Sequence, residues 1–268
     1  MVIGLLAGNG QFPFLFARAA RLKGVRVVVA AVRGDTSPLI HFFVDEVRWF
    51  SVGELGRFFS FCRERGVTHV LMAGQIAPAR LFDKNVSWDG EIRDIFKALS
   101  DRRCDTIYGA LADRLKREGL ELLDSTFLLQ DHLAPRGTLT RRAPTLDELA
   151  DIEFGVGIAK HLGEIDAGQT VVVKGKAVVA LEALEGTDAC IRRGGRIART
   201  GAVVVKTSKP RQDSRFDVPV IGPRTIETMR SCRAVCLAIE AGKTLIIDRD
   251  RTVALADKAG ICIVSAGA

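Results

Sequence analysis

The chain has 268 residues, of which 47% are hydrophobic and 26% charged, and its formal net charge is +7 at pH 7. This length suits one large domain or two ordinary ones, and the composition is typical of a globular protein. No apolar run approaches the ~18 residues of a membrane-spanning helix. The opening MVIGLLAGNG lacks the basic start of a signal peptide, so none is expected.

The positive charge is compatible with three kinds of partner: nucleic acid, an anionic lipid surface or a phosphorylated substrate. A base-stacking surface is not expected, because the chain has one Tyr and its 14 Phe lie mostly in apolar runs. The six cysteines and four histidines are scattered. Cys232 and Cys236 have a spacing that could reach a metal, but no second Cys/His pair accompanies them. We therefore expect reduced thiols, and neither a zinc site nor a Cys–His or Ser–His–Asp arrangement.

The first half of the chain alternates apolar runs, one of them rich in β-branched residues, with stretches of helical periodicity. This alternation predicts a doubly wound α/β unit. The expected strands are Val2–Ala7, Val25–Val32, Val67–Ala73 and Leu120–Leu123, and the expected helices are Phe14–Lys23, Glu54–Arg65 and 91–118.

The sequence pattern changes around residues 130–146, where two prolines, a glycine and three arginines interrupt the hydrophobic periodicity. We interpret 135–144 as a linker between an N-terminal domain, 1–134, and a C-terminal domain, 145–268. Thr145 is expected to cap the next helix, with Glu148 at the capping-box spacing. The later strands and helices predict a second α/β domain, whose expected elements are 145–162, Thr170–Lys174, Ala177–Leu181, Ala189–Ala198, 202–205, Arg224–Cys232, Ala234–Ile239, Thr244–Ile247, Asp250–Ala259 and Ile261–Val264.

The most informative stretch is AVVVKTSKPRQDSRFDVPVIGP, residues 202–223. An apolar strand leads into two lysines and a polar loop within twelve residues. Cations of this kind neutralise phosphate oxygens, and a carboxylate can hold Mg²⁺ or position water. The alternative is a solvated polar turn between strands. The residues concerned are Lys206, Lys209, Gln212, Asp213, Arg215 and Asp217.

Two further loops follow predicted strands of the first domain. Gly8, Asn9, Gly10 and Gln11 lie between a strand and a helix, where phosphates meet helix N-termini. The loop is neither a full dinucleotide fingerprint nor a Walker A loop, so a plain tight turn is an equal alternative. Gln75 follows another strand and could contact a base or sugar, or serve only as a turn residue.

A third polar group, EALEGTD, follows the Ala177–Leu181 strand. Glu185 and Asp188 could share a metal, and Thr187 could donate to a phosphate. Ordinary helix capping by Thr187 and Asp188 is the simpler alternative. Glu240, at a strand end, is a weaker candidate.

Taken together, these segments resemble the two-domain UDP-2,3-diacylglucosamine pyrophosphatases of the LpxI type, which act in lipid A biosynthesis. The resemblance covers nearly the whole chain. Its distinctive pieces are IGLLAGNGQFP (3–13), MAGQI (72–76), LAPRGTLTRRAPT (133–145), EALEGTDACIRR (182–193), VVVKTSKPRQDSRFDVPVIGP (203–223) and AIEAGKTLIIDRD (238–250).

The resemblance implies an active site in a cleft between a Rossmann-like domain with a parallel sheet and a mixed-sheet α/β domain. It implies Mg²⁺-dependent hydrolysis of UDP-2,3-diacylglucosamine to UMP and 2,3-diacylglucosamine 1-phosphate (lipid X). The essential aspartate of the family's Asp-Leu-Pro-Thr-Ile-Gly motif falls on Asp217. Two departures are visible: Asn9 replaces a glycine of the usual Gly-Gly-Gly, and Val220 replaces a threonine.

These considerations divide the expected roles. Asp217, Asp213 and Lys206 are the expected catalytic residues, and Asp217 and Asp213 are the candidate Mg²⁺ ligands. The expected substrate-binding residues are Gly8, Asn9, Gly10, Gln11, Gln75, Thr187, Asp188, Lys209, Gln212 and Arg215.

We further expect a cytoplasmic protein that associates peripherally with the anionic inner membrane surface, where each cation adds ~1 kcal/mol. A homodimer is left open, and no nucleic-acid partner is expected. Two other classes remain as alternatives: a non-catalytic nucleotide-sugar or acyl-lipid binding protein, and a basic nucleic-acid-binding module. Steep salt dependence of RNA or DNA affinity would distinguish the last of these.

Overall fold

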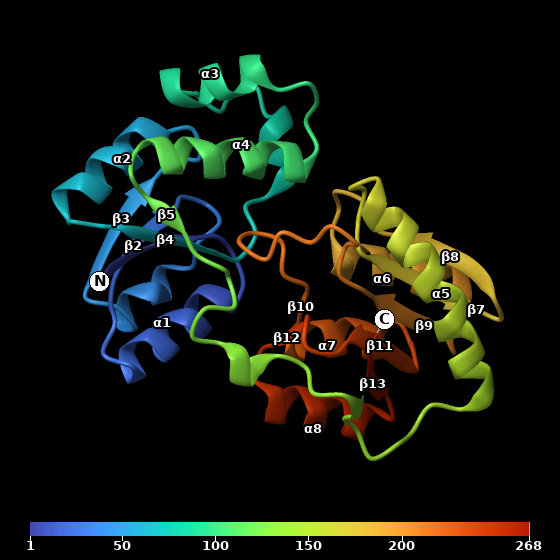
Figure 1. Ribbon diagram of the computed structural model, residues 1–268. Coiled ribbons are helices and arrows are strands. Elements are labelled where there is room, and N and C mark those ends of the chain that lie inside the picture. The colour runs from blue at the N-terminus through green and yellow to red at the C-terminus, as the bar shows by residue number, and fades with distance from the viewer. Residues whose placement is uncertain (268) are drawn as a thin grey trace. The chain divides into compact units, whose positions relative to one another are not determined.

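The computed structural model describes residues 1–267 and divides into two compact units, each described here by itself. Unit 1 comprises Met1–Gln130 together with the short segment Asp213–Asp217. Unit 2 comprises Asp131–Gln212 and the residues from Val218 onward. Both are α/β structures, which confirms the predicted fold class (Figure 1).

Unit 1 is built on a five-stranded parallel sheet in the order β3-β2-β1-β4-β5. The three innermost strands consist mostly of buried apolar residues, as expected for a parallel sheet covered on both faces. Chain order reverses between β1 and β4, which is where open α/β sheets place their ligands. The strands are β1 (Val2–Ala7), β2 (Arg26–Val32), β3 (Glu46–Phe50), β4 (His69–Ala73) and β5 (Glu121–Leu122).

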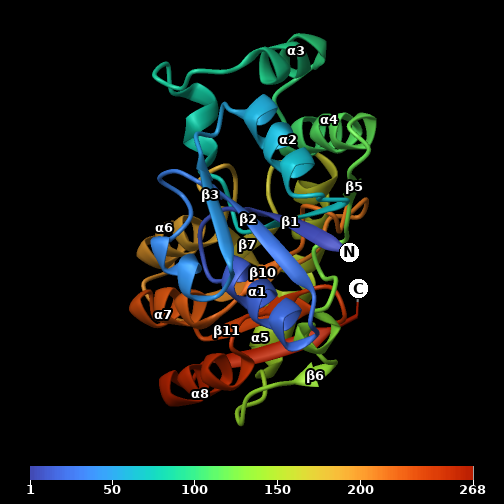
Figure 2. The ribbon, with the colours of Figure 1, turned by 90° about the vertical axis from the view of Figure 1, so that its left-hand side faces the viewer.

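Helices cover both faces of this sheet. Figure 2 shows α1 (Phe12–Leu22) on one face and α2 (Leu55–Glu64) and α4 (Cys104–Arg117) on the other. The second face is closed by an aromatic cluster that includes Phe50, Phe58 and Phe61. The 3-10 turns η1 (Pro38–Phe42) and η2 (Pro78–Phe82) join these elements.

The stretch 91–118, expected to be helical throughout, forms two helices. α3 (Gly90–Ala98) ends at Leu99, whose backbone is extended, and α4 begins only at Cys104. Asp89 caps α3 by accepting a hydrogen bond from the backbone N of Ile92 at 3.0 Å. The strand β3 and the two 3-10 turns carried too little periodicity to be predicted.

Unit 2 contains a six-stranded mixed sheet in the order β6-β13-β11-β9-β7-β8. Strands β9, β11 and β13 are parallel, whereas β7 pairs antiparallel with both β8 and β9, and β6 pairs antiparallel with β13. Strands β10 (Val220–Ile221) and β12 (Leu245–Ile246) form a separate parallel pair. The six-stranded sheet consists of β6 (Gly137–Thr138), β13 (Cys262–Ala266), β11 (Cys236–Glu240), β9 (Val203–Lys206), β7 (Thr170–Lys174) and β8 (Ala177–Leu181).

Successive side chains along these strands point to opposite faces of the sheet and so contribute to two apolar cores. Val203 and Val205 pack beneath α5 (Leu146–Glu164), and Val204 faces a larger core on the opposite side. That core is covered by α6 (Thr187–Ala198), α7 (Pro223–Ser231) and α8 (Arg249–Ala259).

The predicted capping box at the start of α5 is confirmed. Thr145 accepts from the backbone N of Glu148 at 3.2 Å, and the Glu148 carboxylate accepts from the backbone N of Thr145 at 2.8 Å. Residues 135–144, expected to be a linker, lie within unit 2 and supply β6. Thr140 Oγ1 also accepts a hydrogen bond from the backbone N of Ile263 at 2.9 Å, which ties this stretch to the sheet edge.

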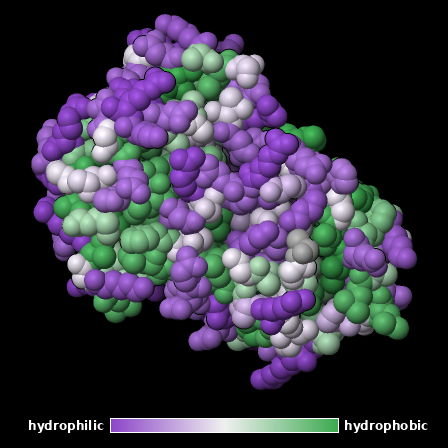
Figure 3. Space-filling view, viewed as in Figure 1, coloured by the Kyte–Doolittle hydropathy of each residue, from purple (hydrophilic) through white to green (hydrophobic). Residues whose placement is uncertain are grey.

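Hydrophobic side chains are not confined to the cores. Figure 3 shows a hydrophobic surface gathered over α5 and β8, where Leu146 and Leu149 are exposed. In the described part of the chain, none of the helices combines the length and apolar character needed to cross a membrane. All six cysteines are free thiols, as predicted, and burial raises the pKa of Cys62 and of Cys190 to about 12.

Candidate functional site

The loops that follow β1 and β4 are joined by backbone hydrogen bonds. Gly8 N donates to Ala73 O and Asn9 N donates to Gln75 O, both at 2.8 Å. The structure therefore brings the predicted residues Gly8–Gln11 and Gln75 together at the reversal of strand order in unit 1. This position is typical of phosphate and nucleotide sites in doubly wound sheets.

Glycine is required at two positions of this junction. A Cβ on Gly8 would lie 2.6 Å from Gln75 O. Gly74 has φ +84°, and a Cβ there would lie 2.3 Å from Asn9 O. Asn9 itself has no positive φ, so an asparagine is accommodated at this position without backbone strain.

The segment 213–217 belongs to unit 1 and is anchored next to the end of β4. Ser125 N donates to Ser214 O at 2.8 Å. Ser125 Oγ lies 2.9 Å from Met72 O and 2.7 Å from Arg215 O, and its single proton can serve one of them at a time. Ser125 was not predicted from the sequence, because an isolated serine in a loop carries no distinguishing pattern.

Within this segment Asp213 and Arg215 form a two-pronged ion pair. Arg215 Nη2 lies 2.6 Å from Asp213 Oδ2, and Arg215 Nε lies 2.9 Å from Asp213 Oδ1. The hydrogen bond from Arg215 is the main cause of the lowered pKa of Asp213. In this conformation the Asp213 carboxylate holds the arginine in place.

Asp217 ends the segment and is half-buried. Its backbone N donates to Asp213 O at 3.0 Å, which closes a turn around the segment. One residue earlier, Phe216 stacks on Tyr108 with ring centroids 5.4 Å apart. Burial, together with the nearby charges of Cys104, Asp217 and Asp35, raises the pKa of Tyr108 to about 12, so its phenol stays protonated.

In unit 2, Lys206 ends β9 and points at the start of α6. The side chain is buried, and its Nζ donates to Thr187 Oγ1 at 2.8 Å. Thr187 Oγ1 in turn donates to Glu182 Oε1, also at 2.8 Å. Burial alone would raise the pKa of Glu182, but the charge of Lys206 and hydrogen bonds from neighbouring groups outweigh it and lower that pKa.

This arrangement suits an anion. A lysine ammonium beside the N-terminus of a twelve-residue helix provides both a full positive charge and backbone N–H groups. The helix begins at Thr187, two residues earlier than predicted, and its N-cap residue is Gly186, which makes no side-chain capping hydrogen bond. Asp188 pairs with Arg224 at 2.7 Å, and Glu185 pairs with Arg193 at 2.5 Å, so both carboxylates have cationic partners.

The other predicted cation of the loop, Lys209, is also buried. Its Nζ contacts Asp166, and its backbone N donates to Gln212 Oε1 at 2.7 Å. Gln212 thus closes a turn with its side-chain oxygen.

Glu240 has a larger structural role than the sequence indicated. Its carboxylate accepts from Ser208 N at 2.9 Å and from Lys160 Nζ at 2.8 Å, and Lys243 Nζ lies 2.6 Å away. Burial would raise its pKa, but these hydrogen bonds lower it to about 2. Glu240 therefore fixes the backbone immediately after Lys206.

Both halves of the chain match family models. The LpxI N-terminal domain model matches residues 2–132, and the LpxI C-terminal domain model matches residues 135–264. The chain therefore belongs to the LpxI family. It is 30% identical, over 98% of its own length and 96% of the relative's, to a Caulobacter vibrioides protein named UDP-2,3-diacylglucosamine pyrophosphatase LpxI.

Two solved structures show a weak similarity to the chain. The biotin carboxylase domain of Hydrogenobacter thermophilus 2-oxoglutarate carboxylase aligns with a TM-score of 0.25 and 13% identity, covering 73% of this chain and 41% of that one. A Campylobacter jejuni biotin carboxylase gives a TM-score of 0.25 and 10% identity, with coverages of 73% and 42%. At these scores the two structures carry no argument about fold or function.

Proposed function

We propose that this protein hydrolyses the pyrophosphate bond of UDP-2,3-diacylglucosamine to give UMP and 2,3-diacylglucosamine 1-phosphate, a step of lipid A biosynthesis. The observation that carries the proposal is the similarity, along nearly the full length, to a relative named UDP-2,3-diacylglucosamine pyrophosphatase. In the reaction, the oxygen of a water molecule bonds to one phosphorus and the bridging P–O bond breaks, so that the bridging oxygen leaves with the other phosphate. The two protons of the water are released as both products ionise.

The residues of unit 2 supply the charge that such a reaction needs. Cleavage of a pyrophosphate depends mainly on electrostatic stabilisation of phosphate oxygens and on positioning of the nucleophile. Lys206 is held by Thr187 beside the N-terminus of α6, which suits a phosphate group. The Lys206 side chain is preorganised, because its strand end is fixed by Glu240 through Ser208.

The residues of unit 1 offer the carboxylates. Asp217 is the proposed group that orients the attacking water or holds a metal ion, and Asp213 keeps Arg215 oriented. The Gly8–Gln11 loop and Gln75 are the proposed contacts to the nucleotide part of the substrate, since they lie at the strand-order reversal.

Mg²⁺ is the proposed cofactor, and the residues present are compatible with it. Residues 1–267 contain no cluster of three or more His, Cys, Asp or Glu side chains placed to hold a metal. Mg²⁺ is commonly held by only one or two carboxylates together with substrate phosphates and water. Asp217 is the preferred ligand here, with Asp213 second because both of its oxygens contact Arg215. The ion would neutralise charge on the pyrophosphate.

We further propose that the protein works at the cytoplasmic face of the inner membrane. The net charge of +7 favours contact with anionic lipid, and the proposed substrate is itself acylated. The alternative function, a non-catalytic binding protein for the same ligand, predicts tight binding without turnover.

Release of UMP from the purified substrate tests the proposal. Wild-type protein with Mg²⁺ should release UMP, and metal-stripped protein in excess EDTA should not. Binding of the substrate without UMP release, at any divalent cation tried, would favour the alternative. Undiminished hydrolysis in EDTA would support the hydrolase activity but contradict the requirement for a metal ion.

A further inference from the structure

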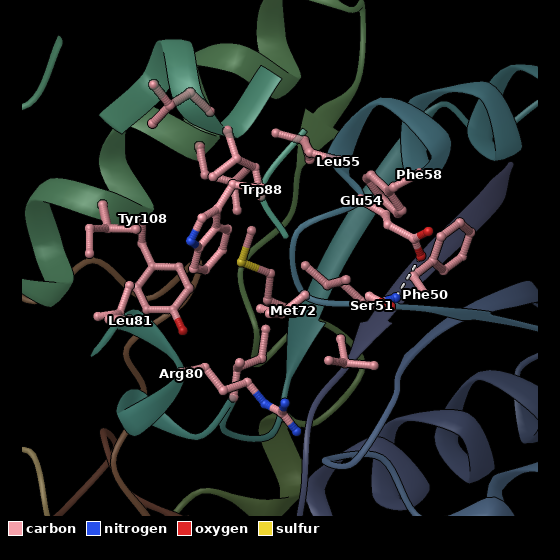
Figure 4. A pocket seen from close by; sticks show the side chains of 18 of the residues that line it. Phe50, Ser51, Glu54, Leu55, Phe58, Met72, Arg80, Leu81, Trp88 and Tyr108 are labelled. Carbon is pink, nitrogen blue, oxygen red and sulfur yellow. Dashed lines mark hydrogen bonds between the residues drawn. The ribbon is translucent and has the colours of Figure 1, made fainter. Parts of the chain in front are cut away.

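Unit 1 contains an apolar cavity to which the proposed function has so far assigned no role. It has a volume of about 160 Å³ and lies between the sheet and helices α2, α3 and α4. Figure 4 shows aromatic and aliphatic side chains projecting into it from several elements. Among the residues that line it are Phe50, Phe58, Met72, Leu81, Trp88 and Tyr108.

The wall carries few polar groups, and two pairs that involve them are already formed. Ser51 N donates to Glu54 Oε2 at 2.7 Å, the contact drawn in Figure 4, and Arg80 Nε lies 2.7 Å from Asp35. Neither pair requires a polar ligand. The chemistry of the wall therefore favours an apolar occupant, because filling such a space with hydrocarbon removes apolar surface from water.

Helix α3 gives independent support. Its apolar side chains Ile92, Ile95 and Phe96 line the cavity, yet no residue of this helix is buried. Trp88, which also lines the cavity, packs edge-on against Phe96 with ring centroids 5.1 Å apart. The apolar face of α3 is thus turned toward the cavity while its own packing remains incomplete.

The cavity is adjacent to the segment that carries Asp217. Tyr108 lines the cavity and stacks on Phe216, the residue before Asp217. Phe216 packs against the same hydrophobic cluster as the cavity wall. A ligand whose polar end lies near Asp217 would therefore have this apolar space within reach of a flexible chain.

We propose that the cavity binds the end of one straight fatty acyl chain. This inference rests on the proposed function, since an acylated substrate supplies such a chain next to its phosphates. The volume is close to that of a 150 Å³ protein cavity that holds a benzene molecule. It accommodates the last part of a single chain, so the second chain of a diacylated ligand lies elsewhere.

Tryptophan fluorescence tests binding without reference to activity. The chain has two tryptophans, and Trp49, hydrogen-bonded to His41 at 3.2 Å, is not part of the cavity wall. A Trp49→Phe variant leaves Trp88 as the only tryptophan. A fatty acid that carries a nitroxide near its methyl end, used below its aggregation concentration, should quench Trp88 saturably.

Cavity-filling variants provide the comparison. Ile95→Phe and Leu111→Phe, made singly in the Trp49→Phe background, should weaken quenching at least tenfold. Both positions are only half-buried, so the larger ring has space to enter and a failure of one variant to fold leaves the other. Leu22→Phe, at a position 89% exposed on α1, should leave quenching unchanged. Absence of saturable quenching, or equal quenching in the filled variants, would overturn the inference.

A series of substrates with shorter and longer acyl chains separates this inference from the proposed function. For each methylene that enters the cavity, kcat/KM of the wild type should rise about fourfold. The filled variants should lose that rise while retaining hydrolysis of the shortest substrate. If hydrolysis does not depend on chain length, the cavity does not bind the acyl chain of the substrate. The proposed hydrolase activity is then still supported. No hydrolysis of any substrate would contradict the proposed function, and quenching would still decide whether the cavity binds acyl chains.

Discussion

Lys206 Nζ lies 2.8 Å from Thr187 Oγ1, so a buried lysine at the end of β9 is hydrogen-bonded to the first residue of α6. Thr187 Oγ1 in turn donates a hydrogen bond to the carboxylate of Glu182, whose negative charge balances that of Lys206. A buried cation that is paired on one side and adjacent to a helix N-terminus is well placed for a phosphate ligand.

Replacing the lysine should therefore impair the reaction. Lys206→Met should lower kcat/KM by at least 100-fold, about 2.7 kcal/mol, which is typical for loss of one charge-stabilising donor. Steady-state kinetics, with circular dichroism as a check on folding, measures this. Lys258→Met, at an exposed position of α8, should change kcat/KM less than twofold. A folded Lys206→Met protein with near wild-type kinetics would show that Lys206 does not take part in the reaction.

Asp217→Asn should abolish turnover while leaving substrate binding largely intact. The substitution removes the charge that orients water or a metal ion but keeps the size of the side chain and the segment packed through Ser125 and Phe216. Single-turnover kinetics and a binding titration measure the two effects separately. A kcat above about a tenth of the wild-type value, a loss under 1.4 kcal/mol, would show that the assigned role is wrong.

Glu240→Gln should make stability less dependent on pH. The folded-state pKa of Glu240 is about 2 against an ordinary 4.5, which corresponds to about 3 kcal/mol of stabilisation. Because this pKa is depressed, the contribution is fully present above pH 4.5 and is lost as pH falls toward 2. Urea unfolding should show a difference of about 3 kcal/mol between wild type and variant at pH 7 and a much smaller one near pH 2.5. A pH-independent difference would mean that the Glu240 charge is not the cause.

Gly8→Ala should destabilise unit 1, because a Cβ would lie 2.6 Å from Gln75 O and push the two loops apart. We expect a loss of about 1–3 kcal/mol in the free energy of unfolding, as for other overpacked sites. Gly109→Ala provides the matched control, since it lies in α4 with no neighbouring atom within 4 Å of the new Cβ. Alanine at that helical position should stabilise by up to about 1 kcal/mol. Equal effects of the two variants would contradict the close approach of the loops.

The features that the sequence predicted well are those encoded locally. Apolar runs predicted β1 and β4, and the Thr145 and Glu148 spacing predicted the start of α5. The division of 91–118 into two helices was missed because no proline or glycine marks the break at Leu99.

The contacts that shape the candidate site depend on pairs far apart in the chain. Lys209 contacts Asp166 across 43 residues, and Ser125 contacts Arg215 across 90 residues. No periodicity or local spacing reports such pairs, because they form only when the sheet brings distant strand ends together. For the same reason Glu240 was only a weaker candidate at a strand end in the sequence, whereas it holds the loop after β9.

Hydrolysis in ¹⁸O-labelled water, followed by mass spectrometry of both products, tests the central claim most directly. The label reports at once whether the pyrophosphate bond is cleaved by water and which phosphorus is attacked. We predict that UDP-2,3-diacylglucosamine yields unlabelled UMP and 2,3-diacylglucosamine 1-phosphate that carries the label. Label in UMP would contradict the proposed direction of attack, and the absence of both products would contradict the enzymatic function itself.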